Sequence, residues 1–328
     1  MNRIFFDNRM ATALLTATAM FISGCDKAPA DSARPNAASP AGYKPVTVTH
    51  ALGTTVVQRQ PGRVAALDMN ELDFLDQLGV PVAGIPKDHV PHFLARYRED
   101  RQVADTGMIV QPNLEKIHAL RPDLILITPL QAPQYKELSA IAPTIQYDVD
   151  FKNSGRDHID IVKGHLLTLG RIFGKETLAR EKAAALDAKV SAARAVTQAS
   201  SAKALIVMHN RGSFASLGPR SRYGFIFDAL GVKPAHAAPD IGLHGQPVSS
   251  EFIHAANPDI IYVIDRTAVM DGSTPMTADS MSNPLIRQTK AWKNGHVVFV
   301  DSDAWYTSAA SPTSLGLIID DVLKGYRP

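Results

Sequence analysis

The chain of 328 residues has a single cysteine, Cys25, so no internal disulfide can stabilise it. Aromatic residues make up only 7%, and the 34 basic residues nearly balance the 32 acidic ones. No basic block stands out either, which makes nucleic acid an unexpected partner. An apolar content of 45% with 20% charged residues is instead typical of a soluble globular protein, and the length suits two domains of ordinary size.

The N-terminus predicts a secretory signal peptide over residues 1–24, because an apolar run at 10–21 follows two arginines and is too short to span a membrane. The I-S-G-C string at 22–25 resembles a bacterial lipoprotein box, which implies a diacylated Cys25. The alternative is a cleaved secretory protein with a free thiol. Asp26 resembles a retention signal of Gram-negative bacteria, which implies a periplasmic protein anchored by lipid to the inner membrane. Residues 25–42, rich in Ala, Pro and Ser, predict a disordered tether.

A repeated string indicates the architecture. Residues 115–127 read E-K-I-H-A-L-R-P-D-L-I-L-I, and residues 251–263, at an offset of 136, read E-F-I-H-A-A-N-P-D-I-I-Y-V. Each copy predicts a short helix that Pro-Asp ends, followed by a strand buried on both faces of a parallel sheet. We therefore expect an α/β protein with two similar lobes, over residues 43–152 and 175–328.

Between these lobes, apolar residues at a helical spacing of three or four predict one long helix within residues 153–174. This helix is expected to bridge the lobes. A second predicted helix, over 175–197, follows it.

Four predicted loops of the second lobe carry the candidate functional residues. The loops cover residues 210–223, 234–247, 265–275 and 301–312, and they contain Arg220 and Arg222, His244, Arg266, and Tyr306 respectively. In doubly wound sheets, ligands bind at loops beyond the carboxyl ends of the strands. Taken singly, each residue also has a structural explanation: His244 as an ordinary loop histidine, Tyr306 as a packed aromatic, and the arginines as partners of nearby aspartates.

Several strings, in order along nearly the whole mature chain, carry a family resemblance. They include R-V-A-A-L-D at 63–68, L-D-Q-L-G-V-P-V-A-G at 75–84, the 115–127 repeat, H-G-Q-P-V-S-S-E-F-I at 244–253, N-P-D-I-I-Y-V-I-D-R at 257–266 and D-A-W-Y at 303–306. The chain resembles the periplasmic siderophore-binding lipoproteins of iron ABC importers, in the subgroup for ferric catecholate, petrobactin and anguibactin-type siderophores. That resemblance implies the class III fold, two Rossmann-like lobes bridged by a long α-helix. It also implies a monomeric, non-enzymatic binding protein with no permanent cofactor.

The resemblance also implies a ligand set. His244 and Tyr306 match residues that fill iron positions left open by the siderophore, and Arg222 and Arg266 match arginines that hold its anionic oxygens. Arg220 is a further candidate for siderophore binding. Leu130 stands where the subgroup usually has a third arginine, which makes a mixed or less anionic siderophore more plausible, with Arg220 or Lys87 as possible compensation.

Glu115 and Glu251, the first residues of the two repeats, match acidic residues that dock onto the inner-membrane permease dimer. Each is also explained as a first-turn glutamate that complements its helix dipole. The alternatives to siderophore binding are a zinc, manganese, haem or cobalamin binder, and an enzyme that uses Asp240, His244 and Ser249 or Ser250. No nucleophile elbow or second histidine supports the enzyme.

Overall fold

The computed structural model describes residues 42–152, 154–236 and 244–327, all within one compact unit. The expected signal peptide, Cys25, nearly all of the tether and Asp240 lie outside the described residues. Within these ranges, no helix is both long enough and apolar enough to cross a membrane.

The first sheet has five strands, all parallel, in the order β5-β4-β3-β8-β9. Together with its connecting helices it is called the first lobe here. The strands are β3 (Val64–Ala66), β4 (Gly84–Ile85), β5 (Ala104–Asp105), β8 (Leu124–Ile127) and β9 (Thr144–Gln146). The helices are α1 (Met69–Gln77), η1 (His92–Leu94), α2 (Arg96–Glu99), α3 (Leu114–Leu120), η2 (Pro129–Gln134) and α4 (Tyr135–Ile141). Two antiparallel hairpins accompany the sheet: β1 (Val46–His50) with β2 (Gly53–Val57), and β6 (Gly107–Met108) with β7 (Gln111–Pro112).

The second sheet defines the second lobe and has the order β13-β11-β10-β14-β15, with β12 also paired to β10. Strands β10, β14 and β15 are parallel, whereas β11 and β13 are antiparallel to their neighbours. The strands are β10 (Lys203–Asn210), β11 (Ser213–Leu217), β12 (Lys233–Pro234), β13 (Gln246–Val248), β14 (Ile260–Asp265) and β15 (Val297–Phe299). The helices are α7 (Gly224–Asp228), α8 (Ser250–Ala256), α9 (Arg266–Asp271), α10 (Ala278–Met281), η3 (Ile286–Gln288), α11 (Lys290–Lys293), the short π-helix η4 (Asp303–Thr307) and α12 (Pro312–Lys324).

The repeated strings form equivalent helix–strand pairs, α3 with β8 and α8 with β14. Each helix begins at a side-chain cap, Asn113 for α3 and Ser249 for α8, and each ends at a residue in the left-handed region, Arg121 or Asn257. The predicted helix, Pro-Asp stop and buried strand are confirmed in both copies.

The aspartate of each repeat makes the same hydrogen bonds. The carboxylate of Asp123 accepts from the backbone N–H of Arg63 at 2.8 Å, and that of Asp259 accepts from the N–H of Lys203 at 2.9 Å. Each aspartate N–H in turn donates to the carbonyl of the same partner at 2.9 Å. The repeat therefore fixes where the neighbouring strands β3 and β10 begin.

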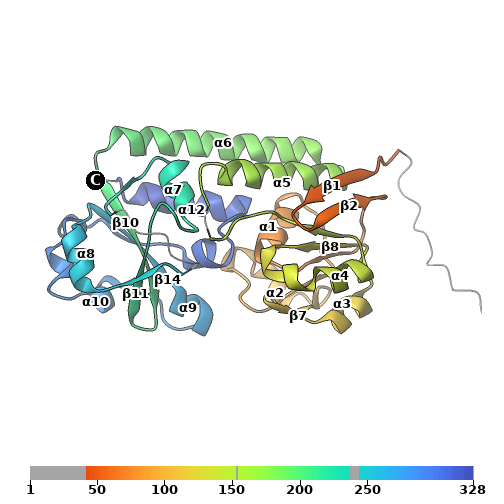
Figure 1. The fold of residues 1–328 in the computed structure, drawn as a ribbon, viewed down its shortest axis with the longest axis horizontal. Helices are drawn as coiled ribbons and strands as arrows, with labels where there is room; N and C mark the ends of the chain where they lie inside the picture. Colours follow the sequence, from red (N-terminus) through yellow and green to blue (C-terminus); the bar gives the residue numbers. More distant parts are fainter. Residues whose placement is uncertain (1–41, 153, 237–243, 328) are drawn as a thin grey trace, which may run out of the picture. The chain divides into compact units, whose positions relative to one another are not determined.

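Two long helices, α5 (His158–Phe173) and α6 (Glu176–Ala199), connect the lobes and lie side by side (Figure 1). At one end of α5, His158 hydrogen-bonds the carbonyl of Ala309 in the second lobe. At its other end the carbonyl of Phe173 accepts from Gln60, beside the first lobe. Helix α6 likewise contacts both lobes, through Lys182 to Gln77 and through Thr197 to the carbonyl of Leu230. The helix expected within 153–174 is thus one of two that run between the lobes.

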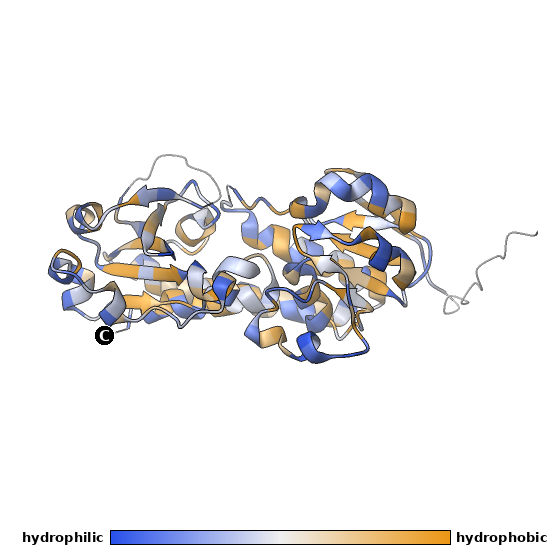
Figure 2. Ribbon diagram, turned by 90° about the horizontal axis from the view of Figure 1, so that it is seen from below, coloured by the Kyte–Doolittle hydropathy of each residue, from blue (hydrophilic) through white to orange (hydrophobic). Residues whose placement is uncertain are grey.

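The cores follow the sheets. In Figure 2 the central strands are coloured hydrophobic, and strands β8 and β14 are buried along their whole length. The helices that cover the sheets alternate hydrophobic and hydrophilic residues, as expected for elements with one face in the core.

Three segments of the second lobe differ from the predicted loops. Residues 210–223 contain strand β11, which turns back on β10 through Arg211 and Gly212, both with positive φ (49° and 83°). Such a two-residue turn is typical of a hairpin but usually has the sequence Asn-Gly. Because this turn is Arg-Gly, the hairpin was not predicted from the sequence. Residues 265–275 contain helix α9, and residues 301–312 contain η4; these loop predictions were wrong.

Candidate functional site

The candidate residues of the second lobe gather around Tyr306. The hydroxyl oxygen of Tyr306 accepts from Nε of Arg266 at 2.6 Å and lies 3.3 Å from Nε2 of His244. A terminal nitrogen of Arg222 donates to the carbonyl of Tyr306 at 3.0 Å. Four of the five residues expected to bind the ligand therefore form one cluster. Arg220 is exposed and takes no part in these contacts.

The fold positions Tyr306 through its neighbour. Trp305 is buried, and its indole N–H donates to the carboxylate of Asp321 on α12 at 3.0 Å. The carbonyl of Trp305 accepts from the hydroxyl of Tyr223 at 2.7 Å. Because Trp305 is fixed on both sides, η4 holds the half-buried Tyr306 at the carboxyl end of β15.

Arg222 is only 8% exposed and is surrounded by aromatic rings. Its guanidinium carbon lies 5.4 Å from the ring centre of Tyr223, 5.5 Å from that of Tyr306 and 6.0 Å from that of Phe151. Its Nε is buried without a hydrogen-bond partner. Cation–π contacts compensate a buried charge only in part, so this arginine favours a nearby anion.

Arg266 likewise has neutral partners. Besides Tyr306, it donates from a terminal nitrogen to the side-chain oxygen of Asn210 at 2.9 Å. In the described part of the chain, neither Arg222 nor Arg266 forms an ion pair with a carboxylate. The two guanidinium carbons lie 5.5 Å and 5.3 Å from the ring centre of Tyr306, so they give the cluster a local positive charge.

His244 is affected by this charge. Desolvation lowers the pKa of His244, and the nearby Arg266 and Arg222 lower it further. A lowered pKa keeps the imidazole neutral near pH 7, with a lone pair available for a metal ion. A cavity of about 290 Å³ opens at His244 and Arg266 and is also lined by Asn210, Phe214 and Pro247.

Three supporting residues, Asp265, Asn210 and Phe151, were not predicted from the sequence. Asp265 caps α9 by accepting from the N–H of Ala268 at 3.2 Å, and it is held by Nδ1 of His209 at 2.9 Å, which together orient the start of the helix that carries Arg266. The D-R-T-A string could have indicated this cap. Asn210 and Phe151 gave no local signal, because only the fold brings them to the arginines.

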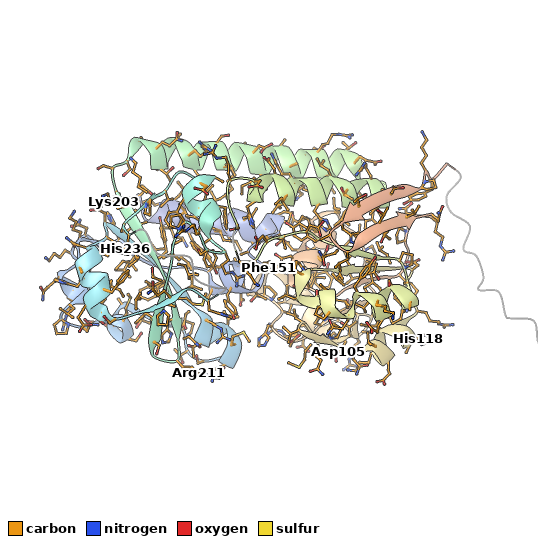
Figure 3. The ribbon with its side chains drawn as sticks, viewed as in Figure 1. Asp105, His118, Phe151, Lys203, Arg211 and His236 are labelled. Carbon is orange, nitrogen blue, oxygen red and sulfur yellow. The ribbon has the colours of Figure 1, made fainter. Side chains whose placement is uncertain are left out.

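Residues that follow strands of the first sheet contact the second lobe close to Tyr306 and Arg222. His92, which follows β4, contacts Asp301 through Nε2 at 2.7 Å, and its backbone N–H donates to Asp303 at 2.9 Å. Phe151, which follows β9, lies beside Arg222 between the two sheets (Figure 3). Leu130, in η2 after β8, is 37% exposed. The cluster thus lies on the side of the second lobe that contacts the first lobe.

The two repeat glutamates lie apart from this cluster. Glu115 and Glu251 are exposed and occupy the first turns of α3 and α8. A hydrogen bond from Ser249 lowers the pKa of Glu251, which keeps it ionised. Over the described residues, no group of three or more His, Cys, Asp or Glu side chains is arranged to hold a metal ion.

Two relatives of known binding activity match nearly the whole chain. It is 56% identical over 318 residues to the ferric-anguibactin-binding protein FatB of Vibrio anguillarum, a match that covers 97% of this chain and 98% of FatB. It is 36% identical to the petrobactin-binding protein YclQ of Bacillus subtilis, over 94% of this chain and 95% of YclQ.

Solved structures agree with these matches. The siderophore-binding protein BauB, bound to a complex between two molecules of acinetobactin and ferric iron, superimposes with a TM-score of 0.84 at 60% identity, over 87% of this chain and 99% of BauB. The crystal structure of YclQ gives a TM-score of 0.81 at 36% identity, over 87% and 99% of the two chains. The expected class III fold, with two α/β lobes joined by long helices, is confirmed.

A sequence model of the family described as periplasmic binding protein matches residues 64–304. Its members are binding proteins, not enzymes, which settles the enzyme alternative. With this match and the identity to FatB, the chain belongs to the periplasmic binding protein family.

Proposed function

We propose that this protein is the substrate-binding component of an ABC importer and captures a ferric siderophore in the cleft between its lobes. The observation that carries the proposal is the pair of arginines, Arg222 and Arg266, that meet at Tyr306 and form no ion pair with a carboxylate among the described residues. The relatives support it, since FatB is a ferric-anguibactin-binding protein and YclQ a petrobactin-binding protein.

The residue types suit the chemistry of the cargo. Fe³⁺ is a hard cation that prefers oxygen ligands, and its charge drives a coordinating phenol to lose its proton. Tyr306 supplies such an oxygen, and His244 lies 3.3 Å from it with its pKa lowered. These two residues complete the iron shell where the siderophore leaves positions open, while Arg222 and Arg266 hold its anionic oxygens. The siderophore is of a catecholate or mixed catecholate type, with Arg220 as a further contact at the exposed end of the same loop.

Delivery depends on the rest of the chain. Cys25, lipid-modified, anchors the protein to the periplasmic face of the inner membrane, and it acts there as a monomer. Glu115 and Glu251 occupy matching first-turn positions on the two lobes, so they present a pair of carboxylates to the two subunits of a permease dimer.

The test is a fluorescence-quench titration of the mature protein with ferric bis-catecholate, ferric tris-catecholate and ferric hydroxamate complexes, and with Zn²⁺. Tight binding of a ferric catecholate is expected, with a tyrosinate-to-iron absorption band for the bis-catecholate. Tyr306→Phe should remove that band, whereas Tyr135→Phe should keep it. Tyr135 is a fair control because it is also half-buried and has its ring 5.6 Å from a histidine, His50.

Two results would contradict the proposal in different ways. Tight binding of Zn²⁺ without binding of any ferric complex would refute siderophore capture. Normal affinity and an unchanged absorption band in Tyr306→Phe would remove only the role of Tyr306 as a ligand of iron.

A further inference from the structure

Three exposed apolar side chains mark the first lobe. Of the six large hydrophobic side chains exposed in the described part of the chain, three follow strands of the first sheet: Met108 (52% exposed) in β6, Val110 (60%) in the β6–β7 turn and Leu130 (37%) in η2. These three are called the apolar rim. Exposed apolar side chains are common singly, but half of the set at one edge indicates a contact surface.

Hydrogen bonds join the rim into one surface. The side chain of Gln131, next to Leu130, donates to the carbonyl of Ile109 at 2.7 Å. Ile109 lies between Met108 and Val110 in the turn of the β6–β7 hairpin, and its N–H donates to Asp88 at 3.5 Å. Asp88 follows β4 and Gln131 follows β8, so the hairpin crosses the carboxyl ends of both strands.

This edge of the first sheet faces the arginine cluster. In the order β5-β4-β3-β8-β9, strands β4 and β9 flank the pair β3 and β8. The segments that follow β4 and β9 both contact the second lobe. After β4, His92 lies 2.7 Å from Asp301, and after β9, Phe151 lies 6.0 Å from the guanidinium of Arg222. Leu130, which follows β8, therefore stands in the row between these two contacts.

The repeat gives the same placement independently. The offset of 136 residues that relates the two repeats also separates Leu130 from Arg266. Both residues follow equivalent buried strands, β8 and β14. At the position where the second lobe offers a guanidinium to the cleft, the first lobe offers a leucine.

We propose that the apolar rim is the specificity wall of the cleft: it packs against an apolar face of the ferric siderophore and rejects chelates that are anionic on every side. This inference rests on the proposed function and names its substrate class, a ferric chelate of uneven charge. One face carries the anionic oxygens that Arg222 and Arg266 hold. The opposite face is an apolar or aromatic arm that packs on the rim.

Desolvation and burial favour an anionic face at the arginines and an apolar face at the apolar rim. An anionic oxygen placed against Leu130 loses its water and gains no hydrogen bond, whereas an aromatic arm there gains from burial. The ammonium of Lys87, the cation suggested as compensation on this side, donates a hydrogen bond to the carbonyl of Asp100 at 2.8 Å. Phe151 beside Arg222 extends the apolar character of the wall.

The experiment compares two ferric bis-catecholamides that differ only in a benzyl or a methyl group on the linker, together with a tripodal ferric tris-catecholamide. For the intact mature protein we expect about tenfold tighter binding of the benzyl chelate than of the methyl chelate. Leu130→Ala should reduce that preference to about threefold, and the Met108→Ala/Val110→Ala/Leu130→Ala variant should abolish it. Leu130→Arg should raise affinity for the tris-catecholamide about tenfold, since it supplies a cation to the uncovered oxygens.

Leu167→Ala is the matched control, because Leu167 on α5 is also 37% exposed but lies away from the cleft loops. It should keep the preference of the unmodified protein. An unchanged preference in the triple variant overturns the proposal. If that variant also fails to support uptake while binding normally, the rim is a permease contact instead. If the unmodified protein binds no ferric chelate, the proposed function itself fails and the inference with it.

Discussion

His158 offers a test of how burial sets the pH dependence of stability. Its ring is buried at the start of α5, stacks on Phe225 at 4.4 Å between ring centres, and hydrogen-bonds the carbonyl of Ala309 through Nε2 at 3.1 Å. Desolvation, with a smaller contribution from Arg222, lowers the pKa of His158 from 6.5 to about 4. The unfolded chain therefore binds a proton that the folded protein does not, over the range between these two values.

The sign and size of the effect come from proton linkage. Because the folded pKa lies below the unfolded one, acidification from about pH 7 stabilises the unfolded state, and the protein loses stability progressively down to about pH 4. For a fall from 6.5 to about 4, the loss attributable to His158 at about pH 4.5 is about 2.5 kcal/mol.

The variant is His158→Gln, which keeps a donor for Ala309 but cannot titrate. Urea unfolding, followed by circular dichroism at about pH 8 and about pH 4.5, gives the free energy of unfolding for both proteins. Subtracting them at each pH removes the contributions of all other groups. From about pH 8 to about pH 4.5, we expect the free energy of unfolding of the variant to rise by about 2.5 kcal/mol relative to that of the unmodified protein. His118→Gln, on the exposed surface of α3, is the control for replacing a histidine. A difference between His158→Gln and the unmodified protein that stays constant with pH would refute the argument.

Two further predictions concern the helix pair and the docking residues. Gly170→Ala should destabilise the protein by about 1–3 kcal/mol in urea unfolding, because its Cβ would lie 2.6 Å from that of Ala179 across the α5–α6 contact. Gly164→Ala in the same helix has open space and should be neutral or stabilising. Glu115→Ala/Glu251→Ala should leave the affinity for the ferric siderophore intact and abolish its uptake by cells; normal uptake would make the repeated glutamates architectural alone.

The repeat could be predicted from the sequence because its signals are local. A buried parallel strand is a continuous apolar run, and Pro-Asp ends the helix before it, so both copies were identified with their register. The sequence could not show why the aspartate recurs. Asp123 and Asp259 are explained only by the structure, where each holds the start of a neighbouring strand some 56–60 residues away in the chain.

The missed elements depend on partners far along the chain. Strand β11 is stabilised by β10 through a turn whose first residue, Arg211, is unusual at positive φ, so the segment resembled a loop. Helix α9 is only six residues long and depends on the cap from Asp265, which is itself held by His209 from another strand. Short elements of this kind have too little intrinsic propensity to be identified alone.

In the candidate site too, the residues could be predicted from the sequence but their contacts could not. The sequence places His244, Arg222, Arg266 and Tyr306 in four predicted loops, and only the resemblance to a family groups them. Their contacts join residues 40 to 84 positions apart, so no spacing rule could give the distances. Arg220, only two residues before Arg222, is exposed and makes none of these contacts, so its part in ligand binding stays a prediction.

The two lobes differ in chemistry although the repeat makes their frames equivalent. Strands β8 and β14 begin at matching positions, Leu124 and Ile260, and β14 runs two residues further than β8. The segment after each strand is free to differ, because residues beyond the carboxyl end pack against the ligand and not against the sheet. At that point the second lobe has Arg266, bonded to Tyr306, and the first has Leu130, tied through Gln131 to an apolar hairpin. Two similar lobes that offer different side chains, Leu130 and Arg266, favour a ligand whose two faces differ in charge. Leu130→Arg is the smallest change that would give both lobes an arginine at this position.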